Sequence, residues 1–268
     1  MDPAGCRCLV TGAAHGIGRA TAWALAHKGA RLVLCDVDRS AVDDLARELT
    51  ERGLEAHSYG VDVADRSAMS CFASWVETEI GPIDVLVNNA GILRTGGLIE
   101  SSYEDFEKVF SVHLWGVVHA TKLFVPQMIE RGLGAVVNIA SASGRVGFSP
   151  LLAYSTSKFG VVGFSQALAG ELAGRGVTVS AVCPGLVRTN IARHAVLGDE
   201  ERDRLEELLE RKGIAPERVA RAVLRAIETG KAMVDVGSDA RWMSWAARFF
   251  PNRAPGWVAR LSAGPSKQ

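Results

Sequence analysis

The sequence predicts an α/β fold built on a doubly wound parallel sheet. Short runs rich in Val, Ile and Leu alternate with segments of helical periodicity from one end of the chain to the other. Several of these runs are continuously apolar, which is typical of strands that are covered on both faces in a parallel sheet. Alternating strands and helices require right-handed crossovers, and these place helices on both faces of the sheet.

Seven segments are predicted to be strands. They are residues 6–12, 30–37, 55–63, 83–91, 134–141, 177–185 and 231–237. Among the helices expected between them, 39–53 has an apolar face containing Ala41, Leu45 and Leu49 and ends at a glycine. Residues 102–132 predict a long helix that is adjusted at Gly116.

The chain is expected to form one domain over residues 1–268. Its 268 residues are 48% hydrophobic, which is enough to bury one large core. Residues 190–214 lose the strand pattern and become charged and helical, so we expect a substrate-loop insertion over one edge of the sheet. Residues 238–268 are rich in Trp, Arg and Pro and form a C-terminal extension.

Charge and cysteine content exclude several classes of function. The 30 basic and 30 acidic residues balance, so nothing in the overall charge calls for nucleic acid or an anionic membrane as a partner. The five cysteines are scattered and lack a second pair at zinc spacing, so we interpret them as reduced thiols, with Cys8, Cys35 and Cys183 in the core. "CRCLVTG" leaves no room for a signal peptide, and no apolar run reaches the length of a membrane span. We therefore expect a cytoplasmic protein without an integral membrane segment.

The first predicted strand ends in "TGAAHGIG", which contains Gly12, Gly16 and Gly18. Glycines allow a tight turn and let the backbone approach a pyrophosphate, whose charge then meets free N–H groups at the start of a helix. Glycines also occur in ordinary turns between strand and helix. Their position in the first such turn of the chain favours a dinucleotide site.

Asp36 closes the second predicted strand, where a carboxylate can accept hydrogen bonds from ribose hydroxyls and repel a 2′-phosphate. NAD is therefore favoured over NADP. Asp36 could instead cap the next helix, but Asp38 or Ser40 is the better candidate for the cap. Arg39 is a possible phosphate partner and keeps NADP open. Asp62 closes the third strand, where it either reaches the adenine edge or serves as a plain turn residue.

Three polar residues in the second half of the chain predict acid–base chemistry. Tyr154 and Lys158 are four residues apart, so a helix places them on one face. A free tyrosine has a pKa near ~10, and a neighbouring ammonium lowers that pKa by stabilising the phenolate. Ser141 closes the fifth strand, at the sheet edge where ligands bind in such folds, and can orient a reacting oxygen. Tyr-x-x-x-Lys alone is usually a surface pair; together with Ser141 and the glycine turn it favours an enzyme.

Five short motifs follow one another in a characteristic order and spacing: "TGAAHGIG", "NNAG" (88–91), Ser141, "YSTSK" (154–158) and "PG" (184–185). On these motifs the chain resembles the short-chain dehydrogenase/reductases of the single-domain type, from about residue 6 to residue 190. The resemblance implies a Rossmann-type, seven-stranded parallel sheet with helices on both faces. It also implies hydride transfer between a nicotinamide and an alcohol or ketone.

The resemblance further implies the residues of the site. Those expected to bind the cofactor are Gly12, His15, Gly16, Ile17, Gly18, Asp36, Asp62, Val63, Asn89, Ala90, Gly91, Tyr154, Lys158, Pro184, Gly185, Val187 and Thr189. In the implied oxidation, Tyr154 takes the alcohol proton, Ser141 orients the oxygen, and Lys158 also holds the nicotinamide ribose. Ser143 is a lesser candidate for contact with the substrate.

His113 departs from the family pattern, because many relatives carry Asn there and use it to hold a water that connects the lysine to solvent. As a fourth candidate catalytic residue, His113 could relay protons, since imidazole both donates and accepts. The alternative is that it only fills the same space in the helix. His119 lies on another face and is expected to be structural. No acidic or cysteine partner stands at ligand spacing, so no metal is expected.

The C-terminus is the second departure, because many relatives end in a glycine-rich "DGG" segment used in tetramer packing. Here Trp242, Trp245 and Phe249 recur on one helical face, with Arg241 and Arg248 away from it. We expect this face to be buried against the body of the protein or against a dimer partner. The alternatives are a lid on an apolar substrate pocket and an interfacial contact with a membrane.

The leading interpretation is an NAD-dependent alcohol dehydrogenase or carbonyl reductase that forms a homodimer or homotetramer. Phe148, Leu151, Leu152 and Leu186, with the tail, suggest a bulky apolar substrate such as a steroid, retinoid or lipid. One alternative is an NADP-dependent 3-ketoacyl reductase. Another is a dinucleotide-binding sensor that keeps the fold without catalysis.

Overall fold

The structure is a computed structural model that describes residues 1–191, 199–254, 256 and 257. Its seven strands form one sheet in the order β3-β2-β1-β4-β5-β6-β7, and every neighbouring pair is parallel. The strands are β1 (Arg7–Thr11), β2 (Arg31–Asp36), β3 (Ala56–Gly60), β4 (Val85–Asn88), β5 (Gly134–Ile139), β6 (Val177–Pro184) and β7 (Met233–Val236). The chain order reverses between β1 and β4, which is where ligands bind in open α/β sheets. The predicted fold class is confirmed.

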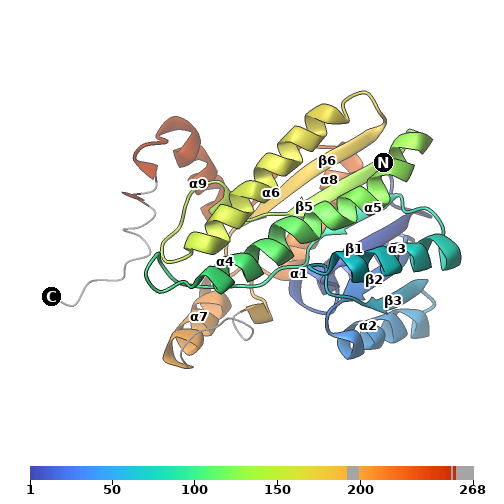
Figure 1. The fold of residues 1–268 in the computed structure, drawn as a ribbon, viewed down its shortest axis with the longest axis horizontal. Helices are drawn as coiled ribbons and strands as arrows, with labels where there is room; N and C mark the ends of the chain where they lie inside the picture. The colour runs from blue at the N-terminus through green and yellow to red at the C-terminus, as the bar shows by residue number, and fades with distance from the viewer. Residues whose placement is uncertain (192–198, 255, 258–268) are drawn as a thin grey trace.

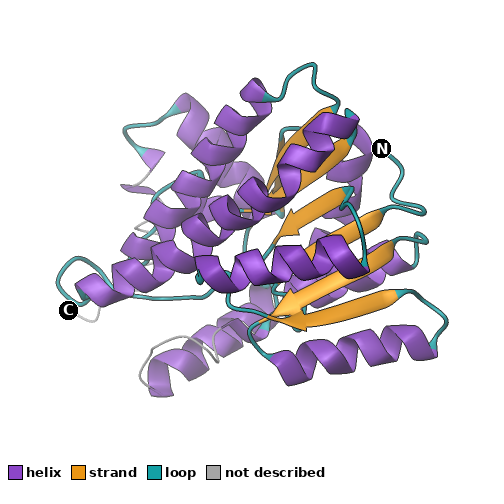
Figure 2. Ribbon diagram, turned by 45° about the vertical axis from the view of Figure 1, so that its right-hand side comes forward, coloured by secondary structure: helices purple, strands orange, loops and turns teal. Residues whose placement is uncertain are grey.

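Helices cover both faces of the sheet (Figure 2). They are α1 (Gly16–Ala26), α2 (Arg39–Glu51), α3 (Arg66–Glu79), α4 (Tyr103–Phe110), α5 (Gly116–Arg131), α6 (Leu152–Glu171), α7 (Asp199–Lys212), α8 (Pro216–Thr229) and α9 (Ser238–Phe249). Side chains of α1, α2 and α8 build the core on one face of the sheet, and those of α3 and α5 build the core on the other.

Strand β2 shows why the predicted strands are continuously apolar. Leu32 and Leu34 belong to the core beneath α1 and α2, whereas Val33 and Cys35 belong to the core beneath α3 and α5. Successive side chains of a strand point to opposite faces, so a strand covered on both faces needs an apolar residue at each position.

The helix predicted over 39–53 runs from Arg39 to Glu51. Asp38 caps it, as expected, because its carboxylate accepts a hydrogen bond of 3.0 Å from the N–H of Ala41. Leu45 and Leu49 are buried as the periodicity predicts, with Val42 rather than Ala41 completing the buried face.

The long helix predicted over 102–132 is divided. Helix α4 ends at Phe110, a π-helical turn follows over Ser111–Trp115, and α5 begins at Gly116. A Cβ atom at Gly116 would lie 2.8 Å from Cγ2 of Val63, so the glycine lets the helix approach the loop after β3. The adjustment expected at Gly116 occupies the five residues before it, and π turns of this kind are frequent at functional sites.

The charged segment at 190–214 falls partly outside the described residues, since 192–198 are not described. Helix α7 occupies Asp199–Lys212, as its pattern predicts, and the chain then returns to pair Ile214 with Val187 beside β6. No helix among residues 1–191, 199–254 and 256–257 is long and apolar enough to cross a bilayer.

The aromatic face of the C-terminal helix is not buried against the body of the protein. Helix α9 packs through Ala240, Met243 and Ala246 onto Ala142 and Val146. Trp245 is 51% exposed on the other side of the helix, and Trp242 and Phe249 are exposed with it. The expectation that this face packs onto the body of the protein is therefore wrong, because Ala240, Met243 and Ala246 form the inward side of the helix; burial against a dimer partner stays a prediction.

Candidate active site

Ser141, Tyr154 and Lys158 meet at the carboxyl end of the central strands. Ser141 follows β5 and begins a short 3-10 turn, whereas Tyr154 and Lys158 lie one turn apart in α6. Ser141 hydrogen-bonds to the Tyr154 hydroxyl, and Lys158 Nζ lies 5.7 Å from the centroid of the Tyr154 ring. The structure thus brings together three residues that the sequence separates by 17 positions.

Burial dominates the electrostatics of this group. It raises the pKa of Tyr154, and the hydrogen bond from Ser141 lowers it. The N–H of Ser143 donates to Ser141 Oγ at 3.1 Å, which leaves the Ser141 proton free to point toward the tyrosine. Burial also lowers the pKa of Lys158 to about 8, so the ammonium is still mostly protonated at neutral pH.

Lys158 is held in place by the strand below it. Its Nζ donates a hydrogen bond of 3.0 Å to the carbonyl oxygen of Ile139, the last residue of β5, and the side chain is 5% exposed. An ammonium has two further protons, so the remaining donors can serve a ligand at the same edge of the sheet.

His113 lies behind Tyr154 with both ring nitrogens occupied. Nε2 accepts the N–H of Ile92 at 2.9 Å, and Nδ1 lies 2.8 Å from Ser157 Oγ, which itself donates to the Tyr154 carbonyl at 2.6 Å. Because Nε2 accepts, the proton of the neutral ring belongs on Nδ1. Burial and the charge of Lys158 lower the pKa of His113 well below its ordinary value, which favours this neutral form.

This arrangement gives His113 contacts that position Tyr154 rather than a path for a proton relay. Both ends of its hydrogen-bonded chain are backbone groups, the Ile92 N–H and the Tyr154 carbonyl, and neither releases or takes up a proton near neutral pH. The imidazole ring also packs edge-on against Tyr154, with centroids 5.3 Å apart. Ser157 completes this link, and sequence reasoning missed it because a serine within "YSTSK" carries no signal of its own.

The glycine turn packs against the end of β4. A Cβ at Gly12 would lie 2.7 Å from Cα of Ala90, and one at Gly18 would lie 2.0 Å from the Gly12 carbonyl oxygen. Asn89 Nδ2 donates to the carbonyls of Thr11 and Gly12 at 3.0 and 2.8 Å. Any other residue type at Gly12 or Gly18 would therefore separate the turn from the "NNAG" segment.

Within the described residues, the start of α1 has no side-chain cap. His15 stands at the N-cap position and makes no capping hydrogen bond, and the first turn contains no acidic residue. Helices α2, α3 and α4 are instead capped by Asp38, Asp65 and Ser102. The N–H groups at the start of α1 therefore remain available to an anion.

A cavity of about 280 Å³ opens beside this turn, between α1 and the loop after β6. Gly16, Arg19, Arg188 and Thr189 are among the residues that line it. A Cβ at Gly16 would lie 2.9 Å from Cγ2 of Thr189, so the structure places Thr189 directly against the turn.

Asp36 faces the same turn. Its two oxygens accept the N–H groups of Ala14, at 2.9 Å, and of Asp38, at 3.1 Å. Each oxygen keeps a further lone pair for a ribose hydroxyl. Arg39 turns away to Asp43, with Nε 2.7 Å from Oδ2, and so does not complete a phosphate site with its neighbours.

The other expected cofactor residues lie around the turn. Asp62 accepts the N–H of Ala64 at 2.9 Å, which is the geometry of a turn residue. Val63 is buried, and its carbonyl oxygen lies 3.0 Å from Nδ1 of His119, a backbone contact that fits the structural role expected of His119. Ile17 is partly buried in the core under α1, and a Cβ at Gly91 would lie 3.2 Å from His113 Nε2.

The loop after β6 is fixed by an aspartate from α9. Pro184 ends the strand, and the N–H of Leu186 donates to Asp239 Oδ2 at 2.9 Å. A Cβ at Gly185 would lie 2.0 Å from that oxygen, so any other residue here would displace the Asp239 carboxylate. Val187 follows in a short bridge to Ile214. Asp239 was not predicted, because it lies in a tail without strand or motif pattern.

A second set of hydrogen bonds joins α9 to the segment after Ser141. Arg145, which follows the 3-10 turn, donates to Ser244 Oγ through Nε and Nη2 at 3.1 and 2.7 Å. The same guanidinium lies 3.7 Å from the carboxylate of Asp235 in β7. Both loops at this end of the sheet are thus connected to the C-terminal helix.

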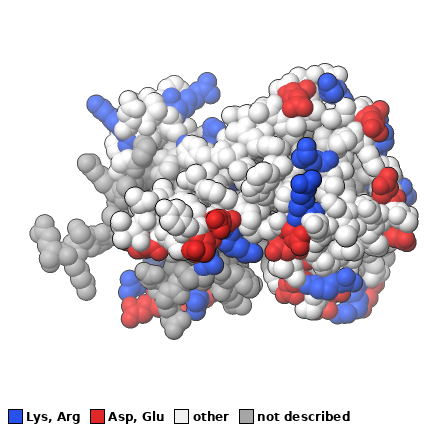
Figure 3. Space-filling model, in the orientation of Figure 1, with Lys and Arg blue, Asp and Glu red and all other residues white. Residues whose placement is uncertain are grey.

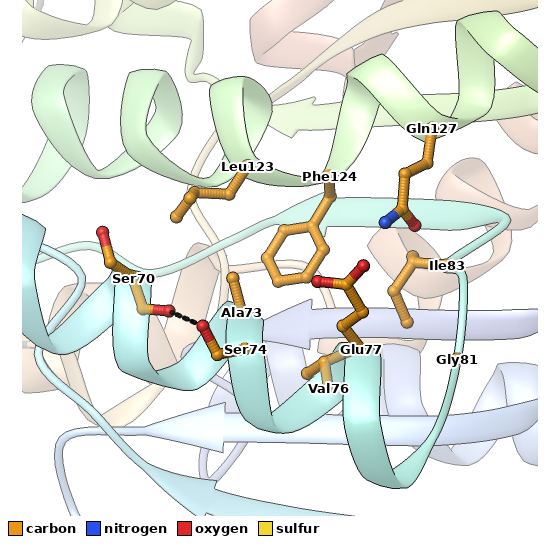
Figure 4. Close-up of a pocket in the computed structure, with 10 residues that line it drawn as sticks. All are labelled: Ser70, Ala73, Ser74, Val76, Glu77, Gly81, Ile83, Leu123, Phe124 and Gln127. Carbon is orange, nitrogen blue, oxygen red and sulfur yellow. Dashed lines mark hydrogen bonds between the residues drawn. The ribbon is translucent and has the colours of Figure 1, made fainter.

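A separate cavity of about 220 Å³ lies between α3 and α5, away from these residues (Figure 4). It is lined by Ser70, Ala73, Ser74, Val76, Glu77, Gly81, Ile83, Leu123, Phe124 and Gln127. Phe124 and Ile83 form its apolar floor, and Ser74 donates to the backbone of Ser70 at 3.2 Å. It contains no candidate catalytic group. In the described parts of the chain, no cluster of three metal-ligating side chains occurs either.

Comparisons with known proteins agree with this geometry. The sequence pattern that describes the short chain dehydrogenases matches residues 7–199. The Probable oxidoreductase EphD of Mycobacterium tuberculosis is 37% identical over 252 residues, which are 90% of this chain but only 43% of EphD. The chain therefore spans less than half the length of that relative. Estradiol 17-beta-dehydrogenase 11 of Mus musculus is 36% identical over 248 residues, 91% of this chain and 80% of the mouse protein.

Solved structures extend the likeness to three dimensions. A short chain dehydrogenase/reductase from Burkholderia phymatum in complex with NAD superposes with a TM-score of 0.85 at 28% identity, covering 92% of this chain and 96% of the other. A single-residue variant of actinorhodin polyketide ketoreductase with NADPH gives a TM-score of 0.77 at 36% identity, covering 86% and 95%. The fold, the order of the motifs and these likenesses lead to one conclusion: the chain belongs to the short-chain dehydrogenase family.

Proposed function

We propose that this protein is an NAD-dependent oxidoreductase that interconverts a secondary alcohol and a ketone. The observation that carries the proposal is the convergence of Ser141, Tyr154 and Lys158 at the carboxyl edge of the sheet. When bound, a nicotinamide dinucleotide supplies the hydride acceptor or donor for this reaction.

Each of the three residues has a distinct role in the proposal. Tyr154 takes the alcohol proton at its hydroxyl oxygen, and returns it when the reaction runs as a reduction. Ser141 holds the substrate oxygen next to that hydroxyl. Lys158 provides a positive charge, which favours the phenolate and offsets the rise in the Tyr154 pKa that burial causes.

The residues of the turn fit a dinucleotide. The uncapped start of α1 would hold the phosphates through its N–H groups, and the glycines keep this surface free of side chains. Asp36 would hold the adenosine ribose and repel a 2′-phosphate, and Arg39 is engaged by Asp43. These contacts support NAD, although solved relatives bind NAD or NADPH.

The proposed substrate is bulky and apolar. Phe148 and Leu151 precede Tyr154 in the loop before α6, and Leu186 follows the glycine of the loop after β6, so both loops bring apolar side chains to this edge. The likeness to an estradiol dehydrogenase supports a steroid-like or lipid-like alcohol. The likeness to a polyketide ketoreductase with NADPH makes an NADP-dependent ketoacyl reductase the second candidate.

The decisive experiment is a substrate panel followed by NADH or NADPH absorbance. We expect oxidation of steroid or long-chain secondary alcohols with NAD, and Tyr154→Phe should lower turnover by at least about a hundredfold without weakening NAD binding. If the wild type binds NAD but turns over no substrate of the panel, so that Tyr154→Phe has no activity to remove, the non-catalytic sensor is favoured. Asp36→Ala should reduce the preference for NAD over NADP by about tenfold or more, and a wild type that prefers NADP would favour the ketoacyl reductase.

A further inference from the structure

The outer side of α9 is an exposed aromatic surface. We call Trp242, Trp245, Phe249 and Phe250 the aromatic face of α9; they are 40%, 51%, 59% and 38% exposed. Trp245 contacts two of the other rings, with its ring centroid 5.5 Å from that of Phe249 and 5.6 Å from that of Phe250. A continuous apolar patch of this kind on a protein surface marks an interaction site.

The helix cannot rotate to bury these rings. Its opposite side is fixed by Ala240 and Ala246 in the small core over the segment after Ser141, and by the hydrogen bonds that Asp239 and Ser244 accept. The aromatic face therefore stays outward while the rest of the helix remains packed.

Basic side chains border the aromatic face. Arg241, Arg248 and Arg253 are exposed, and none forms an ion pair with an acidic side chain among the residues that the structure describes. The one acidic residue of α9, Asp239, turns inward to the N–H of Leu186. The upper part of the left-hand lobe, where α9 lies, accordingly shows blue and white atoms without red ones (Figure 3).

Charge decides which partner fits this surface. A second copy docked through the same face would set arginines against arginines, with no carboxylate to pair them. Anionic lipid headgroups pair with arginine, and Trp and Phe rings favour the boundary between headgroups and acyl chains. We propose that the aromatic face of α9 docks on an anionic lipid surface, lying in its plane as an interfacial helix.

The position of α9 relative to the candidate active site gives this docking a consequence. Helix α9 starts beside the loop after β6, and the segment before α4 turns at the same left-hand end of the molecule (Figure 1). In that segment Leu98, Ile99 and Tyr103 are 73%, 89% and 86% exposed. Docking therefore brings the carboxyl edge of the sheet close to the lipid, where an apolar alcohol would be concentrated.

Vesicle flotation with the full chain tests the proposal. We expect binding to phosphatidylcholine vesicles that contain about one quarter phosphatidylglycerol, at least about tenfold tighter than to phosphatidylcholine alone. The double variant Trp245→Ala, Phe249→Ala should lose at least about tenfold in affinity. Trp115→Ala is the matched control, because Trp115 is 56% exposed on the π turn rather than on α9, and it should bind like the wild type. Charge reversal at Arg248 and Arg253 should abolish the preference for the anionic vesicles.

Two results would overturn the proposal. The first is equal binding of the wild type and the double variant to the anionic vesicles, or no binding by either. The second is a wild-type dimer in sedimentation equilibrium that the double variant dissociates, since a second copy would then cover the aromatic face. Lipid binding needs no turnover, so it can fail while the proposed reaction stands. Turnover of a short, water-soluble secondary alcohol without vesicles should be equal in the wild type and the double variant.

Discussion

Replacing His113 should change how the stability of the protein depends on pH. The folded protein keeps this imidazole neutral, because Nε2 accepts the Ile92 N–H and burial lowers its pKa well below 6.5. The unfolded chain binds a proton there below pH ~6.5. The stabilising contribution is therefore fully present above pH ~6.5 and is lost as the pH falls below it. Between pH ~7.5 and pH ~5.5 the loss amounts to about 1.4 kcal/mol of unfolding free energy.

His113→Asn removes this titration and keeps an acceptor for the Ile92 N–H. We expect this variant to be less stable than the wild type by about 1–2 kcal/mol of unfolding free energy at pH ~7.5. When the pH falls to ~5.5, its unfolding free energy should decrease by about 1.4 kcal/mol less than that of the wild type. His113→Ala leaves the Ile92 N–H unpaired, which costs about 1–3 kcal/mol, and opens a cavity at a side chain that is 1% exposed. Its total cost should be about 3–5 kcal/mol.

Urea denaturation of the three proteins at both pH values measures these differences. Equal loss of stability in the wild type and His113→Asn would refute the reasoning, because His113 would then titrate in the folded protein as it does in the unfolded chain. In kinetics, His113→Asn should keep most activity, whereas His113→Ala should lower kcat more than it raises the KM for NAD, since the ring and Ser157 position Tyr154. Unchanged turnover in His113→Ala would leave the residue with a space-filling role only.

Further predictions concern Lys158 and two helical glycines. Lys158→Met removes the charge that favours the Tyr154 phenolate. The pH at which the oxidation rate rises should therefore increase by about one pH unit or more. The same pH dependence in the variant and the wild type would exclude a role for Lys158 in stabilising the phenolate. The Lys158 pKa of about 8 further implies that the wild type loses this charge above pH 8, which a bell-shaped profile would report. Gly116→Ala should cost about 1–3 kcal/mol because its Cβ would lie 2.8 Å from Val63. Gly163→Ala, in open space on α6, should instead stabilise by about 0.5–1 kcal/mol, and thermal melts compare the two.

The sheet could be predicted from sequence because its signals are local. In β2, Leu32 to Cys35 are apolar at every position, and Gly53 ends the following helix in a left-handed conformation with φ of 77°. Neither signal depends on what a distant segment does. The three residues Ser141, Tyr154 and Lys158 could be expected to meet for a related reason, because carboxyl ends of parallel strands lie at one edge.

The orientation of α9 could not be predicted in this way. Periodicity places Trp242, Trp245 and Phe249 on one face, but the side that turns inward depends on Ala142 and Val146, about a hundred residues earlier in the chain. Ala240, Met243 and Ala246 pack against that segment, and the indole rings lie on the other side of the helix. The hydrogen bonds of His113 could not be predicted either, because its partners Ile92 and Ser157 lie 21 and 44 positions away in the chain.

The carboxylate of Asp239 belongs to two parts of the molecule at once. It lies in the first turn of α9 and accepts the N–H of Leu186, next to a glycine whose replacement would displace it. A ligand that stabilises the loop after β6 through this contact should therefore also stabilise the start of the helix, and the coupling free energy is the same in the reverse direction. Asp239→Ala should weaken this coupling, so that binding at either place depends less on binding at the other.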